Sequence, residues 1–323
     1  MKNIISVLPE RLKKIFETES RIPSVSEIVL RLERPSCVFC ENECLFISPN
    51  GLTRQACKAV SLYRYEIDSV FEKICKSSVY SFEEQIKNGF ISVNGGHRVG
   101  ICGTAVVKNE AVSGFRDING FIFRIAREVK GAGEEAAEYV LNSGKVVNTA
   151  VISPPGGGKT TVLRDLCRIL SESGKRVSVV DERGEIGGVS DGVPSFSSCS
   201  LCDILDSCPK TDGIELALRA LCPDVIVFDE IGDICEAEKL VSAMNSGVSF
   251  VFSAHADSFA SAVRRPAFQM LLKNGALDLV VVLGVGKQRG KIVELKKIKY
   301  EEDGYEATGI DIDPCGKFVL RNI

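Results

Sequence analysis

The chain has 323 residues, 45% hydrophobic and 26% charged, so it can bury a sizeable core and is long enough for two domains. A formal net charge of −3 argues against a general binder of nucleic acids or other polyanions. No apolar run is long enough to span a bilayer, and residues 9–11 interrupt any signal-peptide core. We therefore expect a cytoplasmic protein that contacts membranes only through a partner.

Residues 1–130 are predicted to form a smaller α+β domain. Apolar residues recur there at helical spacing in two segments, and short apolar runs bounded by turn residues predict strands. The expected helices cover 4–16 and 60–74. The expected strands are a pair at 28–32 and 44–47 flanking a loop that contains 41–43, a strand–glycine turn–strand segment at 89–100, and a last strand at 121–127.

A linker over 131–145, with a short acidic helix beginning at Glu134, is predicted to precede a second domain over 146–323. Strands and helices alternate in this domain, which is typical of a parallel, doubly wound sheet. The first of its expected strands ends near Ser153, and the others cover 176–180, 224–228, 249–253 and 278–283. A helix is expected over 214–221, a long functional loop over 187–212 and a hairpin after 287.

A glycine cluster follows the first of these strands and opens a helix. Consecutive backbone N–H groups without Cβ atoms can surround a polyphosphate, and the helix dipole favours its negative charge. Lys159 is predicted to contact the β- and γ-phosphates, and the Thr160 hydroxyl to bind Mg²⁺. Position 153 departs from the usual P-loop pattern, because it is Ser where that pattern has Gly. The predicted nucleotide-binding residues of this variant P-loop are Pro155, Gly156, Gly157, Gly158, Lys159, Thr160 and Thr161.

Carboxylates follow two other expected strands. An apolar run ends in Asp229 and Glu230, and the carboxyl ends of parallel strands meet at one edge of a sheet. Asp229 is therefore predicted to orient Mg²⁺, and Glu230 to polarise the attacking water. Asp181 and Glu182, with Glu185 nearby, repeat this arrangement and could hold metal, activate water or lie in a solvated loop.

A histidine and several arginines complete the candidate site. His255 ends the expected fourth strand, where it can sense the γ-phosphate. Arginines can serve as fingers that reach a neighbouring subunit's nucleotide, although each taken singly is better explained as a surface residue. The candidates are Arg98, Arg116, Arg124, Arg127, Arg264 and Arg265.

Thirteen cysteines in a cytoplasmic chain are expected to stay reduced. Two clusters have metal-like spacing, but each is one thiolate short of a four-ligand structural zinc site. These clusters are Cys37, Cys40 and Cys44, and Cys199, Cys202 and Cys208. We expect no metal at either.

Several sequence blocks together resemble the stage III sporulation protein AA family. They are Gly-Gly-His-Arg-Val-Gly at 95–100, Ser-Pro-Pro-x-x-Gly-Lys-Thr-Thr at 153–161 and Leu-Arg-Asp-Leu at 163–166. Further along the chain are Asp-Glu-Arg-x-Glu-Ile at 181–186, Asp-x-x-Asp-x-Cys-Pro-Lys at 203–210 and Pro-Asp-Val-Ile-Val-x-Asp-Glu-Ile-Gly at 223–232. That family is similar to the secretion and type IV pilus ATPases, so the resemblance implies a RecA-like ATPase domain behind the α+β domain.

The resemblance further implies a Mg²⁺-dependent ATPase that forms a homo-oligomer, with a hexameric ring as the expected assembly. It would power or help assemble a channel between mother cell and forespore, docking from the mother-cell cytoplasm on a small membrane protein of the same complex. Asp181, Glu182 and Glu185 would occupy an acidic box and His255 a histidine box. Arg98, Arg124 and Arg127 would reach the nucleotide.

Two other functions are compatible with the sequence. A nucleic-acid-stimulated NTPase is disfavoured by the acidic net charge and by the lack of a basic stripe interleaved with aromatic residues. A nucleotide-gated scaffold without productive turnover is compatible with Ser153. The residue that holds the attacking water, either Glu230 or one of the 181–185 cluster, is left open.

Overall fold

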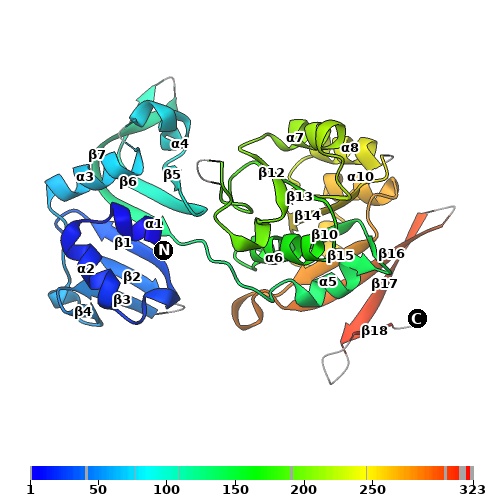
Figure 1. Ribbon diagram of the computed structural model, residues 1–323, viewed down its shortest axis with the longest axis horizontal. Helices are drawn as coiled ribbons and strands as arrows, with labels where there is room; N and C mark the ends of the chain where they lie inside the picture. Colours follow the sequence, from blue (N-terminus) through cyan, green and yellow to red (C-terminus); the bar gives the residue numbers. More distant parts are fainter. Residues whose placement is uncertain are drawn as a thin grey trace. The chain divides into compact units, whose positions relative to one another are not determined.

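The computed structural model describes residues 2–40, 43–76, 78–108, 110–189, 192–244, 246–301, 304–312 and 318–320. The chain forms two compact units, which Figure 1 colours along the sequence. Unit 1 comprises residues 1–126 with 188–193, and unit 2 comprises residues 127–187 and 194–323. The sequence placed the boundary near 131–133, and the structure divides the chain after Ala126.

Unit 1 is built, in the part of the chain that the structure describes, on a seven-stranded antiparallel sheet of order β4-β3-β2-β1-β7-β6-β5. Its helices and this sheet share one apolar core. The strands are β1 (Val25–Arg31), β2 (Cys37–Cys40), β3 (Glu43–Ser48), β4 (Gly51–Thr53), β5 (Phe90–Val93), β6 (His97–Lys108) and β7 (Ala111–Arg124). The helices are α1 (Lys2–Val7), α2 (Glu10–Thr18), α3 (Arg64–Ile74) and α4 (Glu83–Lys87), with short 3₁₀ turns η1 (Ile22–Ser24), η2 (Ala56–Lys58) and η3 (Val79–Phe82).

Two predictions for unit 1 were wrong in detail. The helix expected over 4–16 is two helices, because Pro9 lacks an N–H group and instead caps the start of α2. β1 and β3 do not pair with each other, because β2 lies between them and pairs with both. Residues 41 and 42 of the loop expected there lie outside the described residues.

Unit 2 contains, among its described residues, a nine-stranded sheet of order β12-β11-β13-β14-β10-β15-β16-β17-β18. Its first six strands are parallel: β10 (Thr149–Ser153), β11 (Val177–Asp181), β12 (Cys202–Asp206), β13 (Val225–Glu230), β14 (Ser249–His255) and β15 (Leu279–Leu283). The antiparallel strands are β16 (Ile292–Glu301), β17 (Gly304–Ile312) and β18 (Phe318–Leu320). A separate small ribbon joins β8 (Leu141–Asn142) to β9 (Lys145–Val146).

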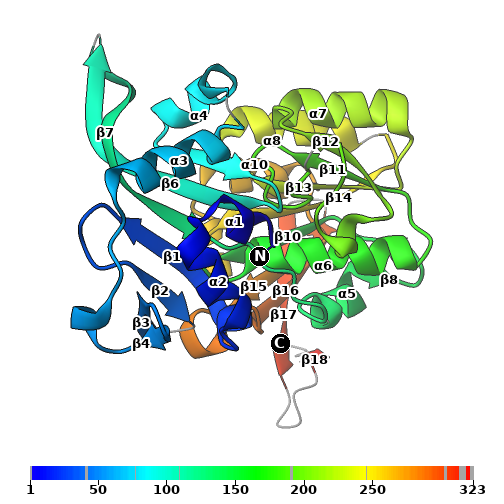
Figure 2. The same cartoon turned by 60° about the vertical axis from the view of Figure 1, so that its left-hand side comes forward.

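Helices cover both faces of this sheet (Figures 1 and 2). Alternate residues of β13 enter different cores: Ile226 and Phe228 pack with α7, α8 and α10, whereas Val225 and Val227 pack with α5 and α6. A parallel strand buried on both faces is expected to be continuously apolar, as β13 is. The helices are α5 (Glu134–Val140), α6 (Lys159–Glu172), α7 (Lys210–Leu216) continued by a π-helical turn η5 (Ala217–Leu221), α8 (Ile234–Met244), α9 (Phe259–Ala262) and α10 (Pro266–Lys273).

The segment 187–212 is not only a loop as predicted. It contains a 3₁₀ turn, η4 (Ser197–Cys199), and β12, which adds a parallel edge strand beside β11. β12 is partly exposed and carries two aspartates, so its short alternating pattern is weak beside the surrounding Gly, Ser and Cys residues. No helix among the described residues is long and apolar enough to cross a membrane.

Candidate nucleotide-binding site

The glycine-rich loop connects β10 to α6, as the sequence predicted. Gly156 and Gly158 have φ angles of 77° and 97°, a region that favours glycine, and Gly158 caps the N-terminus of α6. The Gly290 N–H donates to the Gly157 carbonyl at 3.0 Å. The turn after η6 (Gly286–Gln288) therefore contacts the glycine-rich loop and supports it, a contact that no sequence signal had indicated.

Ser153, the residue that departs from the usual P-loop pattern, lies against the glycine-rich loop. Its side chain is fully buried, and its hydroxyl donates to the Pro154 carbonyl at 2.8 Å. A Cβ added at Gly157 would lie 2.2 Å from the Ser153 Oγ and 2.6 Å from its Cβ. The serine thus occupies space beneath the loop that only a glycine at 157 leaves available.

We expect Gly157→Ala to weaken nucleotide binding, because relieving this clash would displace the loop at a cost of about 1–3 kcal/mol. The double variant Ser153→Gly/Gly157→Ala should recover most of the affinity, because it removes the two closest contacts of the new methyl group and leaves only the Pro154 carbonyl oxygen at 3.2 Å. Titration with a fluorescent ATP analogue measures the affinities, and Ser153→Gly alone is the control. A double variant no better than Gly157→Ala would contradict this account.

A hydrogen-bonded chain links the loop to two strand ends. The Lys159 Nζ lies 2.9 Å from Nδ1 of His255 and 3.2 Å from the Ser153 carbonyl, and the His255 Nε2 lies 3.0 Å from the Glu230 Oε2. Because an ammonium can only donate, Nδ1 accepts and the Nε2–H group donates to the carboxylate. The structure thus brings Lys159, His255 and Glu230 into contact from three segments that are distant in sequence.

Lys159 is buried among charges. Burial lowers the pKa of its ammonium, while Glu230, Asp229 and Glu185 act against that change and Arg265 adds to it. Asp229 is also buried, and the Ser253 hydroxyl donates to its Oδ1 at 3.3 Å. Carboxylates that follow two different strands, Asp229 and Glu230 after one and Glu185 after another, therefore act electrostatically on the P-loop lysine.

Asp181 is engaged with its own loop. The carboxylate is fully buried and accepts backbone hydrogen bonds from Glu185, Ile186 and Gly187 at 2.8, 3.0 and 2.7 Å. Burial raises its pKa to about 6, and the three amides partly oppose that rise, so the group is ionised at neutral pH. Both of its oxygens hold the 182–187 segment in place, an arrangement that suits a positioning residue.

We expect Asp181→Ala to destabilise the protein by about 1–3 kcal/mol, because three buried N–H groups lose their acceptor. ATPase activity should fall as well, because the segment that carries Glu185 would lose its anchor. Urea unfolding measures the first effect. Asp206→Ala on the paired strand β12 is the control, since that side chain is exposed, and it should change stability by less than about 0.5 kcal/mol. Equal effects of the two substitutions would contradict the assignment.

Lys210 is a site residue that the sequence did not single out. Its Nζ donates to the Glu230 carbonyl at 2.6 Å and pairs with Glu236 at 2.8 Å and Glu182 at 3.3 Å. Burial lowers its pKa, but the hydrogen bond and charge of Glu236, together with Glu182, raise it overall. This cation fixes the backbone at Glu230 and holds Glu182. It follows Pro209 at the start of α7 and ends the 203–210 sequence block, which gave no indication of these contacts.

The arginines form two groups. Arg98 on β6 and Arg124 on β7 are direct cross-strand partners in unit 1; Arg98 stacks over Phe90, and Arg124 lies 3.6 Å from Glu27. In unit 2, Arg265 is close enough to Lys159 to influence its pKa. Arg127 begins unit 2, and its buried Nη2 atom has no hydrogen-bond partner among the described residues.

Solved structures share this fold. The Legionella pneumophila ATPase DotB matches with a TM-score of 0.53 over 88% of this chain and 76% of its own, at 14% sequence identity. The pilus retraction motor PilT, solved with bound ADP, matches with a TM-score of 0.52 over 97% of this chain and 83% of its own, also at 14% identity. Unit 2 is accordingly a RecA-like domain with a parallel central sheet, and the predicted fold class is confirmed.

Sequence relatives are closer. Stage III sporulation protein AA of Bacillus subtilis (strain 168) is 33% identical over 312 residues, covering 94% of this chain and 96% of that protein. An uncharacterized protein ycf45 of Cyanidium caldarium is 29% identical over 286 residues, covering 87% of this chain and 76% of its own. Residues 1–305 match the family described as "Sporulation stage III, protein AA". The chain therefore belongs to the stage III sporulation protein AA family, as its sequence blocks had indicated.

Proposed function

We propose that this protein is a Mg²⁺-dependent ATPase. The observation that carries the proposal is the hydrogen-bonded chain from Lys159 through His255 to Glu230, which connects the P-loop with the ends of β14 and β13. Such a chain allows the presence of a γ-phosphate at the lysine to be communicated to a carboxylate placed to act on water. The RecA-like fold and its likeness to ATPases support the same function.

Phosphate binding, metal binding and water activation fall to different residues of the site. Backbone N–H groups of 156–161 bind the phosphates, Pro155 lies directly before them without an N–H group of its own, and Lys159 contacts the β- and γ-phosphates. The oxygen donors of Thr160 and Asp229 suit Mg²⁺, which prefers hard oxygen ligands and would neutralise phosphate charge. Glu230 accepts a proton from the attacking water.

A bound triphosphate would compete with His255 for the Lys159 ammonium. His255 would then be free to turn toward the γ-phosphate, and Glu230 toward water. Glu230 would thus become available to water. Asp181 and Glu182 would not, because three backbone amides hold Asp181 and Lys210 pairs with Glu182. We therefore favour Glu230 over the 181–185 cluster as the catalytic base. Asp181 and Glu182 then serve as positioning residues.

Family membership supports a biological role. A relative named for stage III of sporulation leads us to propose that the ATPase acts in endospore formation, where it powers or helps assemble a channel between mother cell and forespore. It would act from the mother-cell cytoplasm as a homo-oligomer, a hexameric ring, docked on a small membrane protein of that complex. Arg98, Arg124 and Arg127 would contact the nucleotide.

Mass measurement of the purified protein with and without ATP and Mg²⁺, together with an ATPase assay, tests this function. We expect nucleotide-dependent assembly and turnover that requires Mg²⁺. Assembly with no turnover would instead support the nucleotide-gated scaffold. Turnover that rises with single-stranded DNA or RNA, and falls steeply with salt, would support the nucleic-acid-stimulated NTPase.

A further inference from the structure

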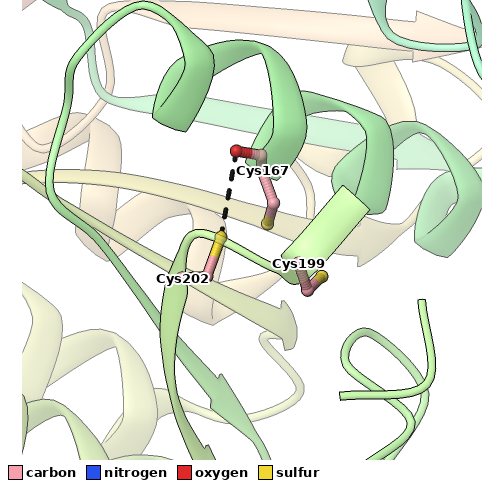
Figure 3. Close-up of side chains that lie close together, drawn as sticks. All are labelled: Cys167, Cys199 and Cys202. Carbon is pink, nitrogen blue, oxygen red and sulfur yellow. Dashed lines mark hydrogen bonds between the residues drawn. The ribbon is translucent and has the colours of Figure 1, made fainter. Parts of the chain in front are cut away.

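Three cysteine side chains from separate elements of unit 2 converge at one place (Figure 3). Cys167 lies on α6, Cys199 at the end of η4, and Cys202 at the start of β12. Their Sγ atoms all lie within 4.8 Å of one another, and this is the one such group of three or more potential metal ligands among the described residues. Spacing in the sequence grouped Cys208 with Cys199 and Cys202, whereas the fold brings Cys167 to them instead.

Cys208 lies away from this cluster. Its Sγ is 3.3 Å from the position of a Cβ on Gly213, near Val180, which belongs to the core on the other face of the sheet. Cys167 and Cys199 belong to the core between α6 and the sheet and are fully buried, whereas Cys202 is partly exposed. The cluster therefore has two fully buried members and one partly exposed member, Cys202, from whose side an ion could enter.

A buried cation stands beside the cluster. Arg164 lies one turn before Cys167 on α6, stacks 3.8 Å over the Phe196 ring and is buried. Its guanidinium donates to the backbone carbonyls of Ile186, Glu185 and Arg127, and no ion pair links it to a carboxylate among the described residues. A buried charge of this kind is stabilised by an anionic neighbour.

The thiols can supply that anion. Cys199 follows Phe196, on which the Arg164 guanidinium stacks, by three residues, and Cys167 follows Arg164 on α6 by three residues. Thiols that bind a metal ion do so as thiolates, so a thiolate–metal group with net negative charge would lie beside this guanidinium.

We propose that Cys167, Cys199 and Cys202 bind a thiophilic metal ion, Zn²⁺, through three thiolates. Binding forms three Zn–S bonds and releases the thiol protons to solvent, with no change in oxidation state. The resulting site carries one negative charge, which Arg164 balances. Tetrahedral zinc with Zn–S distances of about 2.3 Å brings sulfurs to about 3.8 Å apart, so sulfurs that lie within 4.8 Å of one another need to close by no more than about 1 Å. A water molecule would complete the coordination.

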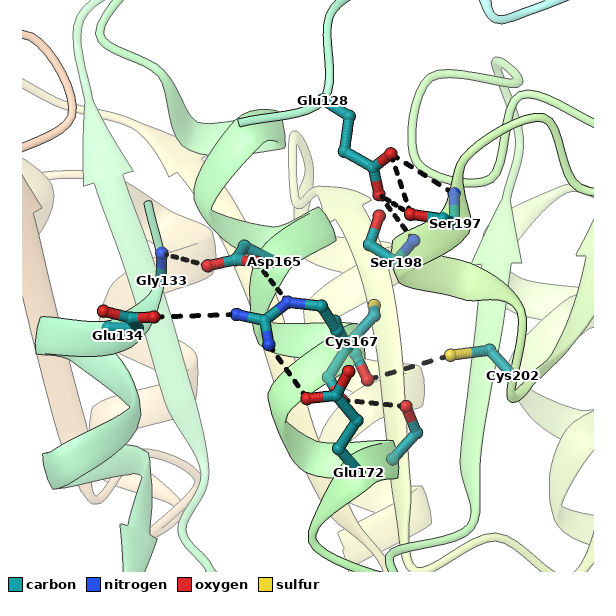
Figure 4. Close-up of polar contacts among 11 residues, drawn as sticks. Glu128, Gly133, Glu134, Asp165, Cys167, Glu172, Ser197, Ser198 and Cys202 are labelled. Carbon is teal, nitrogen blue, oxygen red and sulfur yellow. Dashed lines mark hydrogen bonds and ion pairs between the residues drawn. The ribbon is translucent and has the colours of Figure 1, made fainter. Parts of the chain in front are cut away.

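The site would join the P-loop helix to the segment that holds the beginning of unit 2. Glu128 accepts hydrogen bonds from the backbone N–H groups of Ser197 and Ser198 and from the Ser197 hydroxyl, directly before Cys199 (Figure 4). Cys202 lies 3.9 Å from the Cys167 carbonyl oxygen, a contact drawn in Figures 3 and 4. An ion bound here therefore ties α6 to η4 and β12, and through Glu128 to the first residues of unit 2.

The test uses the full chain, reduced and stripped of metal, then dialysed against Zn²⁺. We expect about one zinc per chain, and a thiolate-to-metal charge-transfer band when Co²⁺ replaces it. Cys202→Ser should abolish both signals. Cys208→Ser is the matched control and should retain them, because its sulfur lies outside the cluster.

Alkylation of the unsubstituted protein gives a readout that needs no variant. Zinc at ten times its dissociation constant should slow modification of Cys199 and Cys202 about tenfold, while exposed Cys57 and Cys235 react unchanged. No retained zinc, unchanged alkylation of Cys202, or equal loss in the two serine variants would overturn the proposal. None of these measurements depends on ATP hydrolysis, so a failed ATPase proposal would leave this one standing.

Discussion

Replacing Lys159 with alanine is expected to reduce ATP hydrolysis by about 100-fold or more. In the proposed mechanism this ammonium is the P-loop charge that contacts the β- and γ-phosphates, and removing a preorganised donor from such a site typically costs two to three orders of magnitude. The change also removes the donor to His255 Nδ1, so the link to Glu230 is broken at the same time. A steady-state ATPase assay with Mg²⁺ measures the loss.

The fold should survive this substitution. Burial already lowers the pKa of Lys159, which means that the charged form is held there at a cost. Removing that charge offsets the lost packing of the side-chain stem, so we expect the free energy of unfolding to change by no more than about 1 kcal/mol. Lys273→Ala, at the exposed end of α10, is the matched control and should leave turnover unchanged. Undiminished hydrolysis by Lys159→Ala would refute the proposed mechanism.

The sequence predicted the glycine-rich loop between β10 and α6 because the signal for it is local. The positions of Gly156, Gly158 and Lys159 depend on backbone conformation and on a helix N-terminus, both of which neighbouring residues determine. The convergence of Asp229 and Glu230 on the loop was also predictable, since parallel strands end at one edge of a sheet. These inferences required only that the strands be parallel, and not the full order of strands in the sheet.

Contacts between distant segments could not be predicted in the same way. Lys210 reaches Glu230, Glu236 and Glu182 only because α7 follows β12, a strand that the sequence did not reveal. Cys167 joins Cys199 through the packing of α6 on η4, and no spacing rule relates residues so far apart. From its position after a strand, Asp181 could hold metal, activate water or lie in a solvated loop; its three backbone partners could not be predicted, because they depend on the turn of the 182–187 segment.

Glu230→Gln is expected to retain ATP binding and to slow cleavage by about 10²- to 10⁴-fold. The amide has nearly the same shape, and its oxygen can still accept the hydrogen bond from His255 Nε2, so the site should keep its geometry. It cannot accept a proton from water, which removes general-base catalysis. Single-turnover hydrolysis and a nucleotide-binding titration separate the two effects.

Two further glutamine variants make the result specific. Glu238→Gln, exposed on α8, controls for the loss of a negative charge and should behave like the unsubstituted protein. Glu182→Gln tests the acidic cluster: this partly exposed carboxylate pairs with Lys210, and such pairs contribute at most about 1 kcal/mol, so we expect less than about a tenfold loss. If Glu182→Gln were the more damaging change, the base would lie in the acidic cluster. Loss of ATP binding in Glu230→Gln would mean that this carboxylate holds the nucleotide or its metal, because an isosteric change that leaves the His255 contact intact has no other route to that effect.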